Sequence, residues 1–329
     1  MTLTRRQTTA ALLCTALPGL PLQAQENRAT VVDETWLDAA RQREVQIKLR
    51  WPDVAAHPGP RPLVLFSHGL GGTRDGGAVW GEAWAAAGFV VLHLQHAGSD
   101  FEALRRVGSS FTDKTALRSV GSPTQLQDRL RDVGFALDEA GRSRASNQSR
   151  WGTVRPAHVG LCGHSFGAIT TLGMAGQRYP KFESVYEPRL ASFITLSPSL
   201  PASGDARQAF AHITRPLLSV TGTRDGDVAG TGATPERRAA VFAALPPEGG
   251  KAHLVLQDAD HMTFAGQTGR AAEIVPRENV TRDLQASQHA LVAAITTDWW
   301  RATLLADMAA QQRLAAPPGL RAGDLWSQK

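Results

Sequence analysis

Cysteine is scarce in this sequence, and long hydrophobic runs are absent. Only Cys14 and Cys162 occur among the 329 residues. Cys14 falls in a segment that export would remove, so the mature chain would keep one thiol and form no internal disulfide. We expect that remaining thiol, Cys162, to be a small buried hydrophobe. No apolar run reaches the length of about 20 residues that a membrane-spanning helix needs, so we predict no membrane span.

Concentrated charge and metal-ligand patterns are also missing. The chain has 35 Lys and Arg against 30 Asp and Glu, and the arginines are scattered. A nucleic-acid partner would require a basic patch with an element that reads bases, and neither is present. His93 and His96 flank the end of a predicted strand, but no carboxylate or cysteine set at ligand spacing accompanies them. We therefore predict structural roles for both histidines, and neither a metal nor another cofactor.

The first 24 residues have the pattern of a signal peptide. Arg5 and Arg6 form a positive segment, residues 10–20 a short apolar one, and residues 22–24 a small-residue cleavage site. We predict an exported protein, periplasmic or secreted, whose mature chain starts close to Gln25. The arginine pair suggests a twin-arginine route, although threonines replace the apolar residues that usually follow. Residues 25–329 contain no repeat or linker and are predicted to form a single domain.

Strand and helix patterns alternate along the mature chain, which predicts an α/β fold: a mostly parallel sheet with helices on both faces. Residues 30–37 and 43–51 have the pattern of an opening antiparallel hairpin. The later strands are expected at 63–66, 89–94, 156–162, 190–196, 216–220 and 252–256, and helices at 78–87, 168–175 and 291–305.

Three further segments carry local signals. Ser122 followed by Pro123 is typical of a helix start, with Gln125 placed to complete a capping box. Residues 97–121 are polar and predict an irregular loop or lid. The Pro-Pro-Gly sequence at 317–319 predicts the start of a loosely attached tail.

The most informative motif is Gly-His-Ser-Phe-Gly at residues 163–167. This G-x-S-x-G pattern, between an apolar strand and a helix of small residues, is typical of a nucleophile elbow. The glycines allow the strand, the turn and the helix to approach closely. We predict that Ser165 is a nucleophile.

A serine nucleophile needs a base, and the base needs an acid that orients it. In this fold the order along the chain is serine, acid, histidine, each beyond the end of a strand. His261 follows the predicted strand 252–256 and is the candidate base. Its alternative role is a surface loop histidine capped by Asp258 or Asp260.

The candidate acid follows the predicted strand 216–220. Asp225 stands three residues beyond Gly222, the usual reach of this turn, and Asp227 is the alternate. We favour Asp225.

Two backbone N–H donors are expected to stabilise the oxyanion that forms when an ester carbonyl is attacked. One would come from Phe166, directly after the nucleophile. The other would come from Leu70 in the glycine-rich loop Ser-His-Gly-Leu-Gly-Gly at 67–72. This loop lacks the lysine of a Walker loop and the spacing of a dinucleotide fingerprint, which argues against a phosphate cradle.

Four segments together, residues 66–72, 163–168, 222–225 and 260–264, resemble the α/β-hydrolases. The resemblance is to the bacterial "predicted dienelactone hydrolase" group, which is related to platelet-activating-factor acetylhydrolases and bacterial polyester hydrolases. It implies Ser165 as nucleophile, His261 as base, an aspartate as orienting acid, and Leu70 and Phe166 as oxyanion donors.

The chain departs from these relatives at two points. Dienelactone hydrolases proper use a cysteine nucleophile, whereas this elbow carries a serine. Platelet-activating-factor acetylhydrolases place the acid after the strand that follows the elbow, where this chain has Ser-Pro-Ser at 197–199. Ester hydrolysis is compatible with both departures.

The sequence therefore predicts a metal-independent serine esterase that forms an acyl-enzyme. The expected partners are small-molecule or polymeric esters, with short to medium acyl groups and some breadth toward aromatic esters. An amidase or acyltransferase on the same residues is the alternative, and a non-catalytic binding protein of the same fold is a more distant one.

Overall fold

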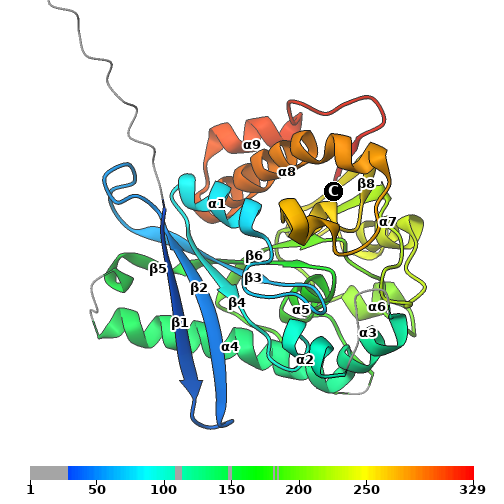
Figure 1. Cartoon of the computed structure of the whole chain (residues 1–329). Coiled ribbons are helices and arrows are strands. Elements are labelled where there is room, and N and C mark those ends of the chain that lie inside the picture. Colours follow the sequence, from blue (N-terminus) through cyan, green and yellow to red (C-terminus); the bar gives the residue numbers. More distant parts are fainter. Residues whose placement is uncertain (1–28, 108–112, 147–149, 181, 184) are drawn as a thin grey trace, which may run out of the picture.

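A computed structural model describes residues 29–107, 113–146, 150–180, 182–183 and 185–329. The predicted signal peptide lies outside these residues. The described chain forms one nine-stranded sheet in the order β1-β2-β4-β3-β5-β6-β7-β8-β9, with helices on both faces (Figure 1). The strands are β1 (Thr30–Asp38), β2 (Arg43–Trp51), β3 (Arg61–Ser67), β4 (Val90–Leu94), β5 (Val154–His164), β6 (Leu190–Leu196), β7 (Leu217–Arg224), β8 (Lys251–Asp260) and β9 (Leu325–Gln328). The α-helices are α1 (Ala78–Ala86), α2 (Phe101–Arg106), α3 (Lys114–Val120), α4 (Pro123–Ala145), α5 (Phe166–Met174), α6 (Ala206–Phe210), α7 (Pro235–Ala244), α8 (Asn279–Leu305) and α9 (Met308–Ala315).

The centre of the sheet is parallel and its edges are antiparallel. Strands β4, β3, β5, β6, β7 and β8 pair in parallel, whereas the β1–β2 hairpin and β9 join antiparallel at opposite edges. The predicted α/β class is confirmed. All parallel strands point their carboxyl ends to one edge, so the loops that follow β3, β5, β7 and β8 meet there.

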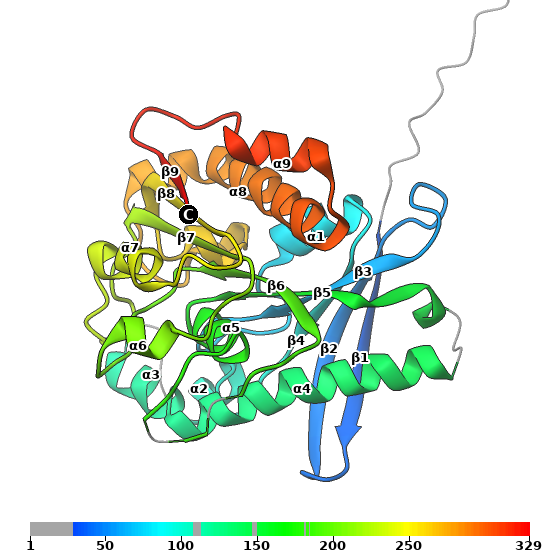
Figure 2. The same ribbon diagram turned by 180° about the vertical axis from the view of Figure 1, so that it is seen from behind.

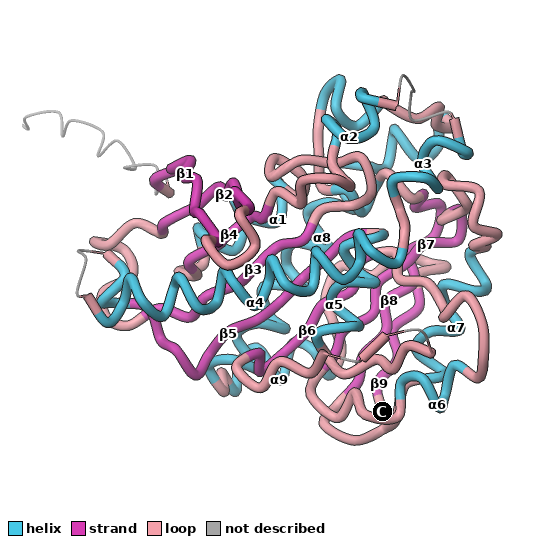
Figure 3. The backbone as a smooth tube through the Cα atoms, turned by 90° about the horizontal axis from the view of Figure 1, so that it is seen from below, coloured by secondary structure: helices cyan, strands magenta, loops and turns pink. Residues whose placement is uncertain are grey.

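Alternate residues of the central strands enter two separate core layers, as the pleat requires. In β3, Leu63 and Leu65 pack into the layer that α4 and α5 cover, whereas Val64 and Phe66 pack into the layer of α1 and α8. Figure 2 shows these two layers of helices from behind, and Figure 3 shows α4 running across the strands. Since the central strands are buried on both faces, they appear in the sequence as short continuous apolar runs.

The segment 97–121, expected as an irregular loop, contains two short helices. Asp100 caps α2 by accepting from the Ala103 amide, and Asp113 caps α3 by accepting from the amides of Thr115 and Ala116. Both helices bury apolar side chains in a small cluster of their own. The expectation was wrong because few apolar residues are enough to anchor helices of this length when each has a good N-cap.

The predicted helix start at Ser122 is present, but the capping box is only half formed. Ser122 Oγ accepts from the Gln125 amide at 3.3 Å. The second hydrogen bond of a capping box, from the Ser122 amide to the Gln125 side chain, is missing, since Gln125 Oε1 has no hydrogen-bond partner among the described residues. The helix that follows, α4, is 23 residues long and reaches across the sheet.

The C-terminal segment is not a loose tail. After the Pro-Pro-Gly sequence the chain returns as β9, which pairs with β8 from Ala252–Gln328 to Val255–Leu325. Lys329 Nζ donates to two carbonyls at the end of α7, each at 2.7 Å. The sequence-based expectation was wrong because β8 has backbone groups to pair at its outer edge, and the terminal strand covers them.

Helix α8 also begins at Asn279, well before the predicted residue 291. Its length does not make it a membrane span: in the part of the chain that the structure describes, no helix combines the length and the apolar character needed to cross a bilayer.

Candidate active site

Ser165 occupies a sharp turn between β5 and α5. Its backbone has φ 55° and ψ −113°, a positive-φ conformation outside the left-handed helical region, which costs a non-glycine residue on the order of 1–3 kcal/mol. The turn is held in place because the Ser165 amide donates to the Leu196 carbonyl at 2.9 Å and the Ser165 carbonyl accepts from the Ala168 amide at 2.9 Å. The strained turn presents the hydroxyl at the carboxyl edge of the sheet.

The two glycines of the motif are required by close backbone approach. A Cβ at Gly163 would lie 2.0 Å from the Gly167 carbonyl oxygen, and one at Gly167 would lie 1.9 Å from the Ser67 carbonyl oxygen. Neither contact can be relieved by moving a side chain, because both partners are backbone atoms.

The structure brings Ser165, His261 and Asp225 into one hydrogen-bonded row. Ser165 Oγ lies 2.9 Å from His261 Nε2, and His261 Nδ1 lies 2.8 Å from Asp225 Oδ1. A carboxylate only accepts, so Nδ1 carries the proton and Nε2 is left free to accept one from Ser165. The loops after β5, β7 and β8 supply one residue each.

Asp225 is fully buried and its carboxylate is completely bonded. Oδ2 accepts from Ser197 Oγ at 2.6 Å and from Thr221 Oγ1 at 2.7 Å. Oδ1 faces His261 and also forms an ion pair with Arg238 Nε at 2.9 Å. Burial alone would raise the pKa of Asp225, but Arg238, His261 and Ser197 together hold that pKa below its ordinary value. The acid is therefore ionised at neutral pH.

Asp227, the alternate acid, lies outside this row. It accepts from the amides of Ala229 and Gly232 at 2.9 and 2.7 Å, and so shapes the loop that follows. The alternative partners of His261 are also engaged elsewhere: Asp258 pairs with Arg224, and Asp260 with Arg277.

His261 is 4% exposed, and its surroundings favour the neutral ring. Burial and the charge of Arg238 lower the pKa of His261, while Asp225 opposes the shift. The net effect keeps the imidazole unprotonated, and able to accept a proton, at neutral pH.

Arg238 on α7 fixes the loops around the acid. Its Nε donates to the Asp225 carbonyl at 2.9 Å, and its Nη1 donates to the carbonyls of Ser197 and Pro198 at 2.9 and 3.2 Å. His164, directly before the nucleophile, lies 3.0 Å from the His261 carbonyl through Nε2. Neither Arg238 nor His164 stood out in the sequence, because their roles depend on contacts with loops distant along the chain.

The glycine-rich loop after β3 lies against the elbow. A Cβ at Gly69 would be 3.4 Å from Ser165 Cβ. Among the described residues the Leu70 amide has no hydrogen-bond acceptor. Phe166 opens α5, where a first-turn N–H has no partner within the helix. Both predicted oxyanion donors thus have unused N–H groups near Ser165.

The other residues singled out from the sequence are internal. Cys162 is fully buried, and burial raises the pKa of its thiol well above the ordinary value. His93 is also fully buried, with Nδ1 3.0 Å from the Gly76 carbonyl. His96 bridges Ser67 and Asp132. Within the described ranges no group of three or more His, Cys, Asp or Glu side chains could hold a metal ion.

Two cavities meet at Ser165 and Leu70. The smaller, about 70 Å³, is bounded by the glycine-rich loop and His261. The larger, about 480 Å³, extends past Phe166 and Ile169 toward the loop at 199–203. A group bonded to Ser165 would therefore have limited space on one flank and ample, largely apolar space on the other.

The sheet order and the strained elbow together are those of an α/β-hydrolase fold. The model of the family "Platelet-activating factor acetylhydrolase, isoform II" matches residues 27–115, which include the glycine-rich loop. Among solved structures, a ferulic acid esterase from Streptomyces cinnamoneus is similar with a TM-score of 0.57 and 18% identity, over 86% of this chain and 92% of that one. No curated protein matches the sequence significantly. The resemblance to the α/β-hydrolase group, predicted from the motifs, is confirmed by the family model and the structural match.

Proposed function

We propose that the protein is a serine carboxylic-ester hydrolase with Ser165 as nucleophile, His261 as base and Asp225 as orienting acid. The observation that carries the proposal is the unbroken row of hydrogen bonds from Ser165 Oγ through His261 to Asp225, at 2.9 and 2.8 Å. The matched family model and the esterase neighbour support the same class of reaction.

In the proposed reaction, Ser165 Oγ attacks the ester carbonyl carbon while His261 Nε2 takes the hydroxyl proton. The N–H groups of Leu70 and Phe166 stabilise the negative oxygen of the tetrahedral intermediate. The alcohol leaves with the proton from His261, and an acyl-enzyme remains. A water molecule then attacks with His261 as base again, and release of the carboxylic acid restores Ser165.

The proposal is tested by hydrolysis of p-nitrophenyl acetate by the wild type and the Ser165→Ala variant. We expect kcat to fall by about 10⁵–10⁶-fold in the variant, because the nucleophile, base and acid act as a unit. Equal rates for the two proteins would overturn the enzymatic assignment and favour a binding protein of the same fold. Cleavage of matched p-nitroanilides at rates above those of the esters would favour the amidase alternative.

The two unequal cavities at Ser165 support a proposal for the substrate class. We propose esters that have a small group on one side of the ester bond and a bulkier group on the other. Short to medium acyl chains and aromatic groups would be accepted in the larger cleft. In a panel of p-nitrophenyl esters, acetate to octanoate should be hydrolysed well and palmitate poorly, because one cavity must hold the p-nitrophenyl group and a 16-carbon chain is too long for the space that remains. A sharp optimum at palmitate, with negligible turnover of acetate and butyrate, would contradict this substrate class.

Export through residues 1–24 stays a prediction from the sequence.

A further inference from the structure

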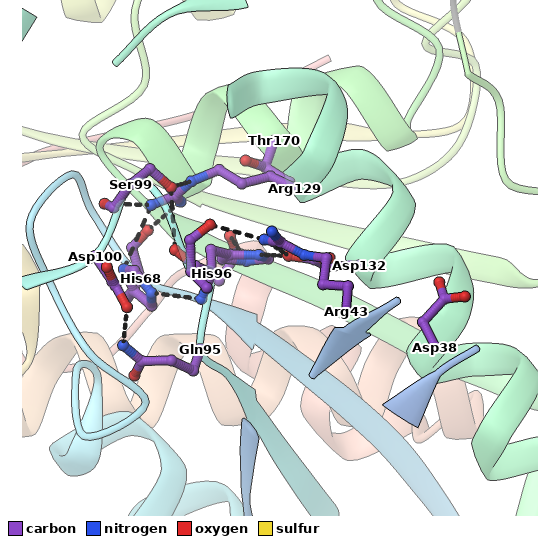
Figure 4. A network of polar contacts seen from close by, with 12 residues as sticks. Asp38, Arg43, His68, Gln95, His96, Ser99, Asp100, Arg129, Asp132 and Thr170 are labelled. Carbon is purple, nitrogen blue, oxygen red and sulfur yellow. Dashed lines mark hydrogen bonds and ion pairs between the residues drawn. The ribbon is translucent and has the colours of Figure 1, made fainter. Parts of the chain in front are cut away.

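A second fully buried arginine lies behind the glycine-rich loop and has no part in the reaction above. Arg129 projects from α4 (Figure 4). Its side chain is 0% exposed. Its Nη1 donates to the His68 carbonyl at 2.6 Å and its Nη2 to the Gly69 carbonyl at 3.3 Å. Its Nε donates to Ser99 Oγ at 2.8 Å. The side chain therefore holds the loop on the face away from solvent.

Within the described part of the chain, the charge of Arg129 is not balanced by a direct ion pair. Among the described residues no carboxylate oxygen lies within ion-pair distance of its guanidinium. Asp132, three residues along the same helix, is bound by Arg41, Arg43 and His96 instead. The charges of Asp132 and Asp100 act on Arg129 without forming an ion pair with it. Burial lowers the pKa of Arg129 to about 9, which leaves the group positively charged at neutral pH.

The peptide between Gly69 and Leu70 connects this charge to the site. The Gly69 carbonyl oxygen accepts from Arg129 Nη2, from the Gly72 amide at 3.1 Å and from His68 Nδ1 at 2.7 Å. The chain has no cis peptide bond among its described residues, so the N–H of Leu70 points to the side opposite that carbonyl. Donors that pull electron density onto the carbonyl oxygen strengthen the N–H of the same peptide as a donor.

The direction of the His68 bond is fixed by the backbone. The His96 amide donates to His68 Nε2 at 3.0 Å, so the proton of the neutral ring is on Nδ1 and is donated to Gly69. Burial lowers the pKa of His68 well below its ordinary value, which keeps the ring neutral. His96 is in turn held by Asp132 at 3.0 Å. Figure 4 shows this row of polar contacts behind the loop.

Arg129 also contacts the residue that would supply the other donor. Its guanidinium carbon lies 4.4 Å from the centroid of the Phe166 ring, within the range of a cation–π contact. One side chain thus touches both the Gly69–Leu70 peptide and the first residue of α5.

We propose that Arg129 is a positioning residue for the oxyanion site: it orients and polarises the Gly69–Leu70 peptide and fixes Phe166, so that both N–H groups are directed at the oxygen that becomes negative. The inference rests on the proposed esterase function. Arg129 acts through the loop and does not touch the substrate.

The test compares an ester with its thionoester, in which sulfur replaces the carbonyl oxygen and accepts hydrogen bonds weakly. Arg129→Gln should lower kcat for the ester by about 10–100-fold and leave KM nearly unchanged. The upper end of this range equals the smallest loss of kcat, about 100-fold, that follows removal of one oxyanion donor. The preference for the ester over the thionoester should fall about as much. Arg129→Lys keeps the charge but loses the planar guanidinium that donates through three nitrogens, so it should lower kcat and the preference by an intermediate factor.

Arg131→Gln is the matched control, since Arg131 lies on the same helix with a side chain 61% exposed. It should change neither the rate nor the preference. If Arg129→Gln does not fold, Ser99→Ala removes only the hydroxyl that accepts from Nε, and it should lower the preference by a smaller factor. An unchanged preference in a folded Arg129 or Ser99 variant overturns the proposal. Absence of turnover by the wild type would instead overturn the esterase function itself.

Discussion

Two buried arginines support the site from either side of β5, and they differ in how their charge is balanced. Arg238 forms an ion pair with Asp225 at 2.9 Å and fixes the loops after β6 and β7. Arg129 has no such partner among the described residues and binds carbonyls of the loop after β3. A paired arginine mainly sets the position and protonation of the acid and base, whereas an unpaired one increases the positive potential where the oxyanion forms.

The site therefore has an acid–base side (Asp225, His261 and Arg238) and an oxyanion side (Leu70, Phe166 and Arg129). Changes on the acid–base side should alter the pH dependence of the reaction. Changes on the oxyanion side should alter the preference for oxygen over sulfur in the substrate. A variant that changes the pH dependence and the oxygen-over-sulfur preference equally would show that the two sides do not act separately.

The largest effect on the acid–base side is expected from Asp225→Asn. This change removes the charge that fixes the His261 tautomer, and kcat should fall by about 10³–10⁴-fold. Asp227→Asn is the matched control: it alters an acid only two residues away that binds loop amides. Its kcat should stay within a few-fold of the wild type in the same assay. The reverse order of losses would assign the acid to Asp227.

A smaller effect is expected from Arg238→Gln, and it concerns pH. His261 must be neutral to act as base, so activity is lost as the pH falls through its pKa. Because the charge of Arg238 lowers that pKa, its removal should move the acidic limb of the kcat/KM profile to higher pH. The wild-type limb should lie below pH 6.5, the ordinary pKa of histidine.

Arg238→Lys keeps the positive charge and should leave the acidic limb near its wild-type position. A limb that does not move in Arg238→Gln, or that moves equally in both variants, would show that Arg238 acts only by holding the loops.

The smallest effect is expected from Thr221→Val. This substitution removes one of the two hydroxyl groups that bind Asp225 Oδ2 and nearly keeps the volume of the side chain. Ser197 still donates to the same oxygen, so we expect kcat/KM to fall by about 2–10-fold, as for loss of one hydrogen bond. A loss as large as that of Asp225→Asn would mean that the hydroxyl, not the ion pair, controls the acid.

The sequence predicted the part of the site that is encoded locally. Ser165, Asp225 and His261 each follow a strand in a recognisable turn, so their convergence could be predicted from the parallel sheet alone. The positions of most strands and of the longer helices followed from apolar runs and caps. The C-terminal strand was missed because its pairing with β8 depends on a contact between segments far apart in the chain.

The two arginines were missed because a charged residue on an amphipathic helix ordinarily faces solvent. A signal was present in the spacing. Arg129 lies three residues after Leu126 and four before Val133, on the stripe that α4 buries. Arg238 lies three residues before Val241, the buried apolar residue of α7. An arginine within a buried stripe predicts a buried polar contact, but only the structure identifies the loops that it binds.

The central claim, that Ser165 is an activated nucleophile, is tested most directly by covalent labelling with diethyl p-nitrophenyl phosphate. Attack by an activated serine forms a bond to phosphorus and expels p-nitrophenolate. We predict release of one equivalent of p-nitrophenolate per protein, a gain of one diethylphosphoryl group in the intact mass, and location of that group on Ser165 by peptide sequencing. Ser165→Ala should gain nothing. Absence of labelling in the wild type, or the same labelling in Ser165→Ala, would contradict the account.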